Sequence, residues 1–250
     1  MTREIQFPTL YQTAPHPCPY IVENTAVNLI LDPHYSVDRS LYGRLLQHGF
    51  RRNGGLYYRP FCNDCSACIS VRVPVAEFVP DRSQRRALRR NADLTSTLTD
   101  ARFSDEHFRL YLRYQAVRHS GDSMDDPDPE KYRRFLVDSE VDTAFLEIRQ
   151  GPRLLAVSII DRVDDALSAI YTFFDPDEPR RGLGTFAVLE QVRIAREAGL
   201  DWVYLGYWIA ESRKMAYKSR FRPLQRFNPV TARWEYHHDE RQGTDALPLR

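Results

Sequence analysis

The stretch that decides the fold is TAFLEIRQGPRLLAVSIIDRVDDALSAIYTFF, residues 143–174. It contains three apolar runs, each rich in the branched and aromatic side chains that favour strands. These runs are Thr143–Arg149, Leu154–Asp161 and Leu167–Phe174. The pairs Gly151-Pro152 and Asp164-Asp165 lie between them, and such pairs are turn signals. The stretch therefore predicts an antiparallel meander of three strands.

The residues after the meander predict a helix, a strand and a second helix. Arg181-Gly182-Leu183-Gly184 opens a segment with apolar residues at helical spacing, which ends at Gly199. Asp201–Tyr207 is rich in Trp, Val and Tyr and reads as a strand, and Glu211–Arg220 reads as a last helix. This order of elements resembles the acetyltransferase-like (GNAT-type) fold, in which a mixed sheet is flanked by helices. It indicates an α+β protein that transfers an acyl group.

The chain divides into two blocks. We predict a smaller α/β N-terminal domain, which carries the cysteines, over residues 1–95 and the transferase domain over residues 96–250. The first block is predicted to contain a strand, a helix and a hairpin, at Ala26–Leu31, Val37–His48 and Arg51–Tyr58. Ile69–Val75 alternates apolar with other residues, so one face of this strand is expected in the core and the other outside it.

The composition is that of an ordinary globular protein, with 250 residues, 42% of them hydrophobic and 28% charged. A net charge of only +1 excludes a protein-wide field for nucleic acid, so any contact with RNA must come from a local patch. No apolar stretch is long enough to span a bilayer, and residues 1–20 lack the pattern of a signal peptide. We expect a cytoplasmic protein without a membrane partner; the oligomeric state is not readable.

All four cysteines lie in the first block, at Cys18, Cys62, Cys65 and Cys68. The last three form a C-x2-C-x2-C pattern, and four thiolates of this kind can ligate zinc or an iron–sulfur cluster. The alternative is a set of buried, reduced thiols near a tight turn, because disulfides are disfavoured in the cytoplasm. Both interpretations stay open, and the identity of a metal cannot be read from the spacing.

Residues 81–91, DRSQRRALRRN, carry five arginines that fall on one face of a predicted helix. These are Arg82, Arg85, Arg86, Arg89 and Arg90. The opposite face, with Gln84, Ala87 and Leu88, is expected to pack against the protein. Five like charges without carboxylates repel one another, whereas guanidinium groups match phosphate oxygens. We therefore favour contact with tRNA phosphates over a merely solvated charged face.

The start of the helix after the meander matches the pyrophosphate loop of coenzyme-A-dependent acetyltransferases only in part. Arg181 and Gly184 fit the pattern [RQ]-x-x-G-x-[GA], but Phe186 stands where the last small residue belongs. Its ring is expected to crowd a phosphate at the helix N-terminus, so another acyl donor, built on RNA, is indicated. A coenzyme-A-dependent N-acetyltransferase and a non-enzymatic RNA-binding or metal-sensing module remain the alternatives.

Several motifs resemble those of the aminoacyl-tRNA–protein transferases, in the right order and over about residues 17–234. In the N-terminal half the motifs are Gly49–Gly54, Tyr58–Cys68, Arg72–Val75 and Arg82–Arg86. In the C-terminal half they are Tyr114–Met124, Gly184–Phe186, Tyr204–Ile209 and Lys214–Phe221. The chain is most similar to the short bacterial branch of this family, the aspartate/glutamate leucyltransferases.

The resemblance implies an aminoacyltransferase that moves leucine from leucyl-tRNA to the N-terminal amine of proteins that begin with Asp or Glu. The product would be marked for protein degradation by the N-degron (N-end rule) pathway. The resemblance implies no cofactor for the chemistry and no coenzyme A. Arginine as the transferred residue stays open, because leucine needs an apolar pocket and arginine an acidic one. The sequence does not show which residues line that pocket.

Replacing an ester by an amide depends mainly on alignment of the reacting groups. The transition state also needs a donor for the developing oxyanion and a proton for the departing ribose oxygen. We expect a backbone N–H within Ile170–Thr172 to bind the oxyanion, and Tyr207 or Tyr217 to relay the proton. The alternative for both tyrosines is a packing role.

Selection of an acidic first residue requires a buried cation in the binding site. The candidates are Arg118 and His119, at the end of a predicted helix that Ser104 caps, together with Arg72. Lys214 and Lys218 are spaced to share one face of the last predicted helix, where they could meet a carboxylate or the terminal tRNA phosphates. The alternatives are a helix-end role for the first pair and a solvated face for the lysines.

Overall fold

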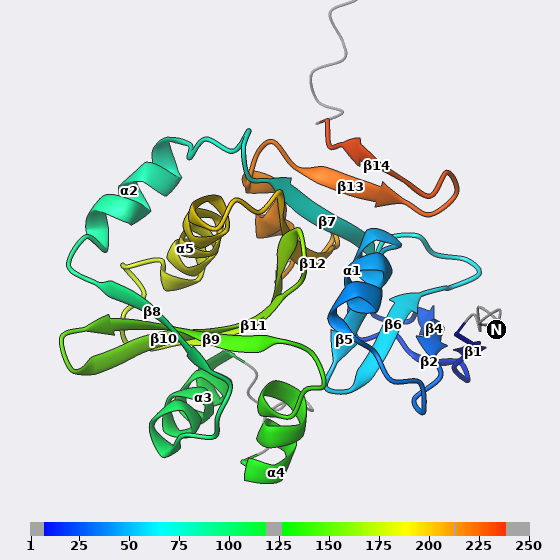
Figure 1. Ribbon diagram of the computed structural model, residues 1–250, viewed down its shortest axis with the longest axis horizontal. Helices are drawn as coiled ribbons and strands as arrows, with labels where there is room; N and C mark the ends of the chain where they lie inside the picture. Colours follow the sequence, from blue (N-terminus) through cyan, green and yellow to red (C-terminus); the bar gives the residue numbers. More distant parts are fainter. Residues whose placement is uncertain (1–7, 119–126, 213, 239–250) are drawn as a thin grey trace, which may run out of the picture.

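The computed structural model of the protein describes residues 8–118, 127–212 and 214–238, and a large mixed sheet lies at its centre (Figure 1). In spatial order the eight strands are β14 (Arg233–Tyr236), β13 (Gln225–Asn228), β7 (Ile69–Pro74), β12 (Trp202–Trp208), β11 (Ala166–Phe174), β10 (Arg153–Arg162), β9 (Thr143–Gln150) and β8 (Thr95–Asp100). All neighbours are antiparallel except β11 and β12, which are parallel.

A smaller sheet lies beside the large one and is formed by the first sixty residues. Its strands, in order, are β1 (Leu10–Gln12), β4 (Asn28–Leu31), β6 (Leu56–Pro60) and β5 (Arg51–Asn53), and the short pair β2 (His16–Pro17) and β3 (Thr25–Ala26) stands apart. The β5–β6 hairpin turns at Gly54, whose φ of 57° lies in the left-handed region that favours glycine.

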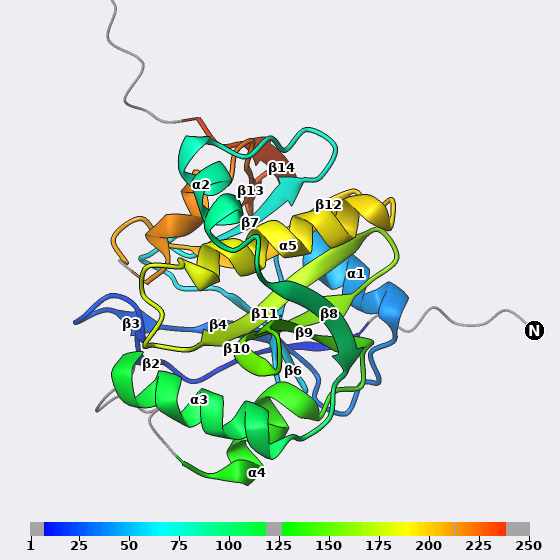
Figure 2. The ribbon, with the colours of Figure 1, turned by 90° about the vertical axis from the view of Figure 1, so that its left-hand side faces the viewer.

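The helical segments are α1 (Arg39–Gln47), α2 (Arg82–Arg90), α3 (Asp105–Arg118), α4 (Pro129–Tyr132), the π-helical η1 (Arg133–Val137), α5 (Leu183–Glu197) and the 3-10 turn η2 (Ala216–Arg220). Helices α5 and α2 cover one face of the large sheet, and α3 and α4 cover the other (Figure 2). Val188, Leu189 and Val192 of α5 pack into the main core with Val71 and Val203 of the central strands. The apolar periodicity of the sequence therefore marks the buried side of α5.

The parallel strands β11 and β12 separate near the middle of the sheet. They pair only from Ala166–Ser168 to Trp202–Tyr204. Bulges lie on both sides of this point, because the register shifts at Ile170 of β11 and again between Tyr204 and Gly206 of β12. The residues Ile170–Thr172, in which we predicted an oxyanion donor, thus lie beyond the last β11–β12 pair; that role stays a prediction.

The meander, the helix after it and the following strand are confirmed, as is an α+β, acetyltransferase-like sheet flanked by helices. The last predicted helix, Glu211–Arg220, is wrong: only Ala216–Arg220 is helical, as a short 3-10 turn. Lys214 lies in the turn before it, so Lys214 and Lys218 do not share a helix face.

The strand β7 also differs from the prediction. Ser70 and Arg72 are buried like their apolar neighbours, because β7 lies inside the large sheet and both of its faces are covered. Since β7 pairs with β12 and β13, the first block supplies a central strand to the sheet of the second. The division at residue 95 therefore does not separate two sheets, and as a domain boundary it stays a prediction.

A buried ion pair joins the β5–β6 hairpin to the large sheet. Both oxygens of Asp161 on β10 accept from Arg52 on β5, each at 2.6 Å, and both side chains are fully buried. Thr143 donates to the same carboxylate at 2.7 Å. Arg52 also donates to the carbonyl oxygen of Gly54, so the pair fixes the hairpin in place.

Candidate functional site

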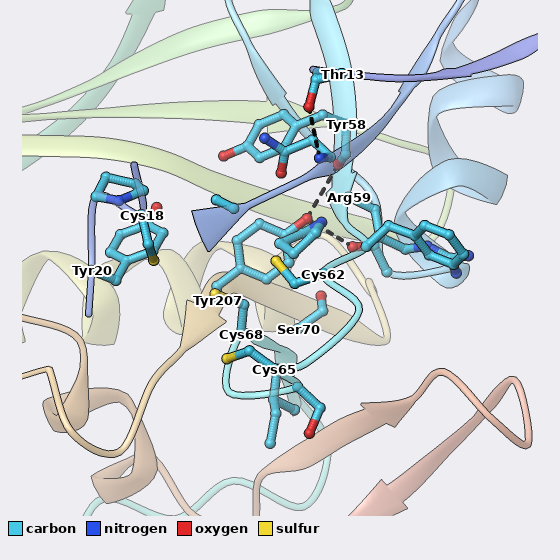
Figure 3. Close-up of a pocket in the computed structure, with 18 of the residues that line it drawn as sticks. Thr13, Cys18, Tyr20, Tyr58, Arg59, Cys62, Cys65, Cys68, Ser70 and Tyr207 are labelled. Carbon is cyan, nitrogen blue, oxygen red and sulfur yellow. Dashed lines mark hydrogen bonds between the residues drawn. The ribbon is translucent and has the colours of Figure 1, made fainter. Parts of the chain in front are cut away.

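A cavity of about 570 Å³ lies between the small sheet and the strands β7 and β12 (Figure 3). Its walls come from β4, β6, the loop at Cys62–Cys68 and the segment around Cys18, with Ser70 and Tyr207 contributed by β7 and β12. The lining is mostly apolar, and its charged or basic side chains are Arg59 and His16. Among the described residues no Asp or Glu lines it.

All four cysteines line this cavity as free, half-buried thiols. In Figure 3, Cys18 lies apart from Cys62, Cys65 and Cys68, with Tyr207 near the centre. Burial, with repulsion from the other three thiolates, raises the pKa of Cys68 to about 12. Within residues 8–118, 127–212 and 214–238, no three His, Cys, Asp or Glu side chains are arranged to hold a metal ion. The thiols as placed do not form a metal centre.

Tyr207 is buried, and its hydroxyl donates toward two backbone carbonyl oxygens, that of Gly49 at 3.1 Å and that of Tyr58 at 3.2 Å. Burial raises the pKa of Tyr207 well above its usual value. Tyr217 instead lies partly exposed beside Phe221, at a small pocket that Gln84 and Thr185 also line. This geometry favours the packing alternative for Tyr207 and leaves the relay role of Tyr217 as a prediction.

Replacing Tyr207 with Phe is expected to lower the free energy of unfolding by about 1–2 kcal/mol, because two buried carbonyl oxygens lose their donor. The transfer rate per folded molecule should stay within about tenfold of wild type, since loss of a general acid costs about a hundredfold or more. Urea unfolding and single-turnover transfer measure the two effects. A loss of rate beyond a hundredfold with unchanged stability would restore Tyr207 as the proton donor.

Lys218 is only 7% exposed, and its ammonium lies at the bulge where β11 and β12 separate. It donates to the carbonyl oxygen of Tyr207 at 2.6 Å and lies 3.3 Å from the sulfur of Met215. A Cβ added to Gly206 would meet its Nζ at 3.4 Å. Burial, reinforced by the nearby charge of Arg51, lowers the pKa of Lys218 to about 7. The predicted contact with tRNA phosphates at a helix surface is not supported by this placement.

The lowered pKa of Lys218 makes stability depend on pH. In the folded protein Lys218 loses its proton near pH 7, whereas the unfolded chain holds it up to about pH 10.5. The unfolded state therefore binds more protons between these values, and stability should rise with pH by about 1.4 kcal/mol per unit from this group. Urea unfolding of wild type and Lys218→Met at pH 7 and pH 9 tests this. An identical pH slope in both proteins would show that Lys218 does not titrate there.

Arg51 was not among the predicted site residues, although it lies beside Lys218. It is 4% exposed, and its Nη2 donates to Ser70 Oγ at 2.8 Å and to the carbonyl oxygen of Val71 at 3.2 Å. Its Nε and Nη1 are buried and have no hydrogen-bond partner among the residues that the structure describes. The sequence offered little signal, since the strand β5 reads Arg-Arg-Asn and is polar throughout.

Arg72 is packed rather than open to a ligand. Its guanidinium lies between Trp202 and Trp234, with its carbon 3.5 Å and 4.3 Å from the two ring centres, and Nε donates to Gln225 at 2.9 Å. Arg72 does not line the cavity. The structure thus places Arg72 in a cation–π stack that stabilises the sheet, away from the other predicted recognition residues.

Arg118 is the exposed last residue of α3, and its side chain contacts the hydroxyl of Tyr114. It does not line the cavity. His119 lies outside the described residues. Lys214 is exposed in the turn before η2. The structure does not bring these cations together with Arg72, and their roles in recognition stay predictions.

The predicted helix is confirmed as α2, with its five arginines on the exposed face. Gln84 and Ala87 are buried and Leu88 is half-buried, while the arginines are exposed. The exposed set is Arg82, Arg85, Arg86, Arg89 and Arg90. Asp81 caps the helix through a capping box with Gln84. Arg85 and Arg90 donate to the backbone carbonyl oxygens of Pro80 and Arg180. Contact of the arginine face with tRNA stays a prediction.

A cluster of ion-paired side chains lies beside the N-terminus of α5. Phe186 packs inward with Leu155, so it does not crowd the helix end as we predicted. Arg181 instead holds two carboxylates there, pairing with Asp93 at 2.9 Å and with Glu178 at 3.3 Å. Carboxylates beside a helix N-terminus repel a pyrophosphate. These carboxylates, and not Phe186, disfavour coenzyme A at this helix end.

Sequence comparisons match nearly the whole chain. Residues 16–86 and 106–228 match the family models described as Arginine-tRNA-protein transferase, N terminus, and Arginine-tRNA-protein transferase, C terminus. The aspartate/glutamate leucyltransferase of Hahella chejuensis (strain KCTC 2396) is 48% identical over 86% of this chain and 92% of its own length. That of Stenotrophomonas maltophilia (strain R551-3) is 48% identical over 94% and 95%.

Solved structures that resemble the chain include FemX, which is 9% identical with a TM-score of 0.43 and covers 80% of this chain and 79% of its own. In the part of the chain that the structure describes, no helix is long and apolar enough to cross a membrane.

Proposed function

Since the chain belongs to the aminoacyl-tRNA–protein transferase family, we propose that it transfers leucine from leucyl-tRNA to the N-terminal amine of proteins that begin with Asp or Glu. The product would enter the N-degron pathway of protein degradation, and the reaction would take place in the cytoplasm, where charged tRNA is made. The observation that carries the proposal is the 48% identity to aspartate/glutamate leucyltransferases over most of both chains.

The cavity supports leucine over arginine as the transferred residue. A guanidinium taken into a cavity of this size needs a carboxylate partner, because a buried cation without one is costly. Ile30, Leu56 and Ile69 line the cavity, and the described lining contains neither Asp nor Glu. An aliphatic leucyl side chain fits the apolar part of such a cavity, whereas an arginyl side chain does not.

In the proposed reaction the α-amine of the acceptor attacks the ester carbonyl carbon of leucyl-tRNA. The C–N bond forms, the bond to the ribose oxygen breaks, and the amine proton ends on that oxygen. The sheet supports this assignment, since Ile170–Thr172 lie beyond the last β11–β12 pair and their backbone groups on that side are not paired with β12. The amine is partly neutral at cellular pH, so alignment contributes more than a strong base. Tyr217 is our candidate for passing the proton.

Single-turnover transfer with purified donors tests the proposal. We expect an Asp-starting peptide to be modified with leucyl-tRNA, and with arginyl-tRNA at least about a hundredfold more slowly, because the acid-free cavity leaves a guanidinium unpaired. A peptide with an acetylated N-terminus is the control, since it has no free amine. Equal rates with both donors, or transfer to the acetylated peptide, would contradict the assignment.

A further inference from the structure

Two buried cations lie next to each other behind the wall of the cavity. Arg51 on β5 and Lys218 in η2 are 4% and 7% exposed, and the charge of Arg51 lies close enough to contribute, after burial, to the lowered pKa of Lys218. Both groups are anchored at the Gly206 bulge: the carbonyl oxygen of Gly206 lies 3.5 Å from Arg51 Nη2, and the carbonyl oxygen of Tyr207 lies 2.6 Å from Lys218 Nζ. Within the described residues neither cation pairs with a carboxylate.

The neighbouring Arg52 is a buried arginine whose charge is paired with a carboxylate. Arg52 holds both oxygens of Asp161 at 2.6 Å. Arg51, one residue earlier, has two buried nitrogens for which the described part of the chain offers no hydrogen-bond partner. Buried charges are normally paired, because the loss of hydration is otherwise uncompensated. Two such cations side by side therefore indicate that an anion completes the site when a ligand is bound.

The position of the pair indicates which anion that is. Ser70 accepts from Arg51 and Tyr207 accepts through its carbonyl from Lys218, and both residues line the cavity. The hydroxyl hydrogen of Ser70 is left to donate to a further acceptor. The rest of the lining is mostly apolar. A small carboxylate at the end of a short side chain fits this wall, whereas a tRNA phosphate would carry its ribose into apolar surroundings.

We propose that the cavity wall at Ser70 and Tyr207 receives the side-chain carboxylate of the substrate's first residue, and that Arg51 and Lys218 are the positioning residues that select it. The proposal rests on the proposed function and assigns its acidic specificity to residues other than Arg118, Arg72 and His119. Ser70 donates to the carboxylate, and the two cations act through Ser70 and through the field they create at the wall.

The test compares transfer of leucine to two peptides that differ only in Asp or Asn at the first position. In Arg51→Met and in Lys218→Met, kcat/KM for the Asp peptide should fall about 30-fold or more. Each substitution removes the cation that interacts with the buried carboxylate, and losing one partner of a buried charge pair has an effect of this size. The Asn peptide should be almost unaffected, so the Asp/Asn ratio collapses. Ser70→Ala should reduce the ratio about tenfold. Arg44→Met, which removes an exposed cation on α1, should leave the ratio unchanged.

Equal losses for both peptides, or a ratio that collapses in Arg118→Ala, would overturn the proposal. If a Met variant fails to fold, two other variants test the proposal. Ser70→Ala must lower the Asp/Asn ratio of kcat/KM, and Lys218→Arg, which keeps the charge, must retain most of that ratio. Binding of the Asp and Asn peptides without tRNA gives the same comparison independently of the chemistry. A wild-type protein that modifies neither peptide would refute the proposed function, not this assignment alone.

Discussion

Replacing Arg52 with Met is expected to lower the free energy of unfolding by about 3–5 kcal/mol, because the substitution leaves the carboxylate of Asp161 buried without its cation. Thr143 alone then remains to donate to that carboxylate. The same substitution frees the β5–β6 hairpin, which lies against the cavity. Transfer activity should therefore be lost at temperatures at which the wild-type protein is still folded.

Urea unfolding followed by circular dichroism measures the effect. Arg39→Met is the control, since Arg39 pairs with Asp164 at 3.1 Å and Asp142 at 3.5 Å and donates to the carbonyl oxygen of Val163 at 3.0 Å. These contacts are exposed or half-buried, so their loss should cost only about 1–2 kcal/mol. Arg51→Met should cost less than Arg52→Met, because Arg51 has no carboxylate to leave behind. If Arg39→Met and Arg52→Met were equally destabilised, the ion pair of Arg52 with Asp161 would not hold the two sheets together.

Reversing three charges on α2, as Arg82→Glu, Arg86→Glu and Arg89→Glu together, is expected to weaken tRNA binding strongly. All three side chains are exposed on one helix face. Each phosphate contact contributes about 0.7–0.9 to the slope of log K against log salt. Loss of the three contacts should therefore make that slope less negative by about 2.

Filter binding of tRNA over a range of salt concentrations measures this slope. The control replaces three exposed residues elsewhere with the same change in charge and includes Arg44→Glu on α1. Both variants should unfold at nearly the wild-type urea concentration, because the substituted side chains are exposed. An unchanged slope in the α2 variant would show that its arginines do not contact phosphate.

The parts of the fold that the sequence predicted are those with strong local signals. The meander is marked by apolar runs and turn pairs, and α2 by the capping box of Asp81 and Gln84. The helix predicted at Glu211–Arg220 failed because tertiary contacts decide that segment. Lys218 donates a hydrogen bond to the carbonyl oxygen of Tyr207, and Phe221 packs into the core. These two contacts hold the segment in a short 3-10 turn.

The candidate site was harder to predict, because its residues come together only through tertiary structure. The cavity joins segments from Thr13 to Val230, so no local pattern describes its lining. In the sequence, Arg51 resembles any exposed charged residue of a hairpin. Its burial follows only from the packing of β5 against the large sheet. Arg72 and Phe186 belong to motifs that the family resemblance singled out, yet they pack inside the protein. Membership of a motif thus does not distinguish packing from recognition.

Mass spectrometry of an Asp-starting peptide, after incubation with the protein and a mixed pool of charged tRNAs, tests the central claim most directly. We expect one product, which carries a single leucyl group on the N-terminal amine, and far less of it when the peptide begins with Asn. An arginyl or acetyl adduct, or a leucyl group on a lysine side chain, would contradict it.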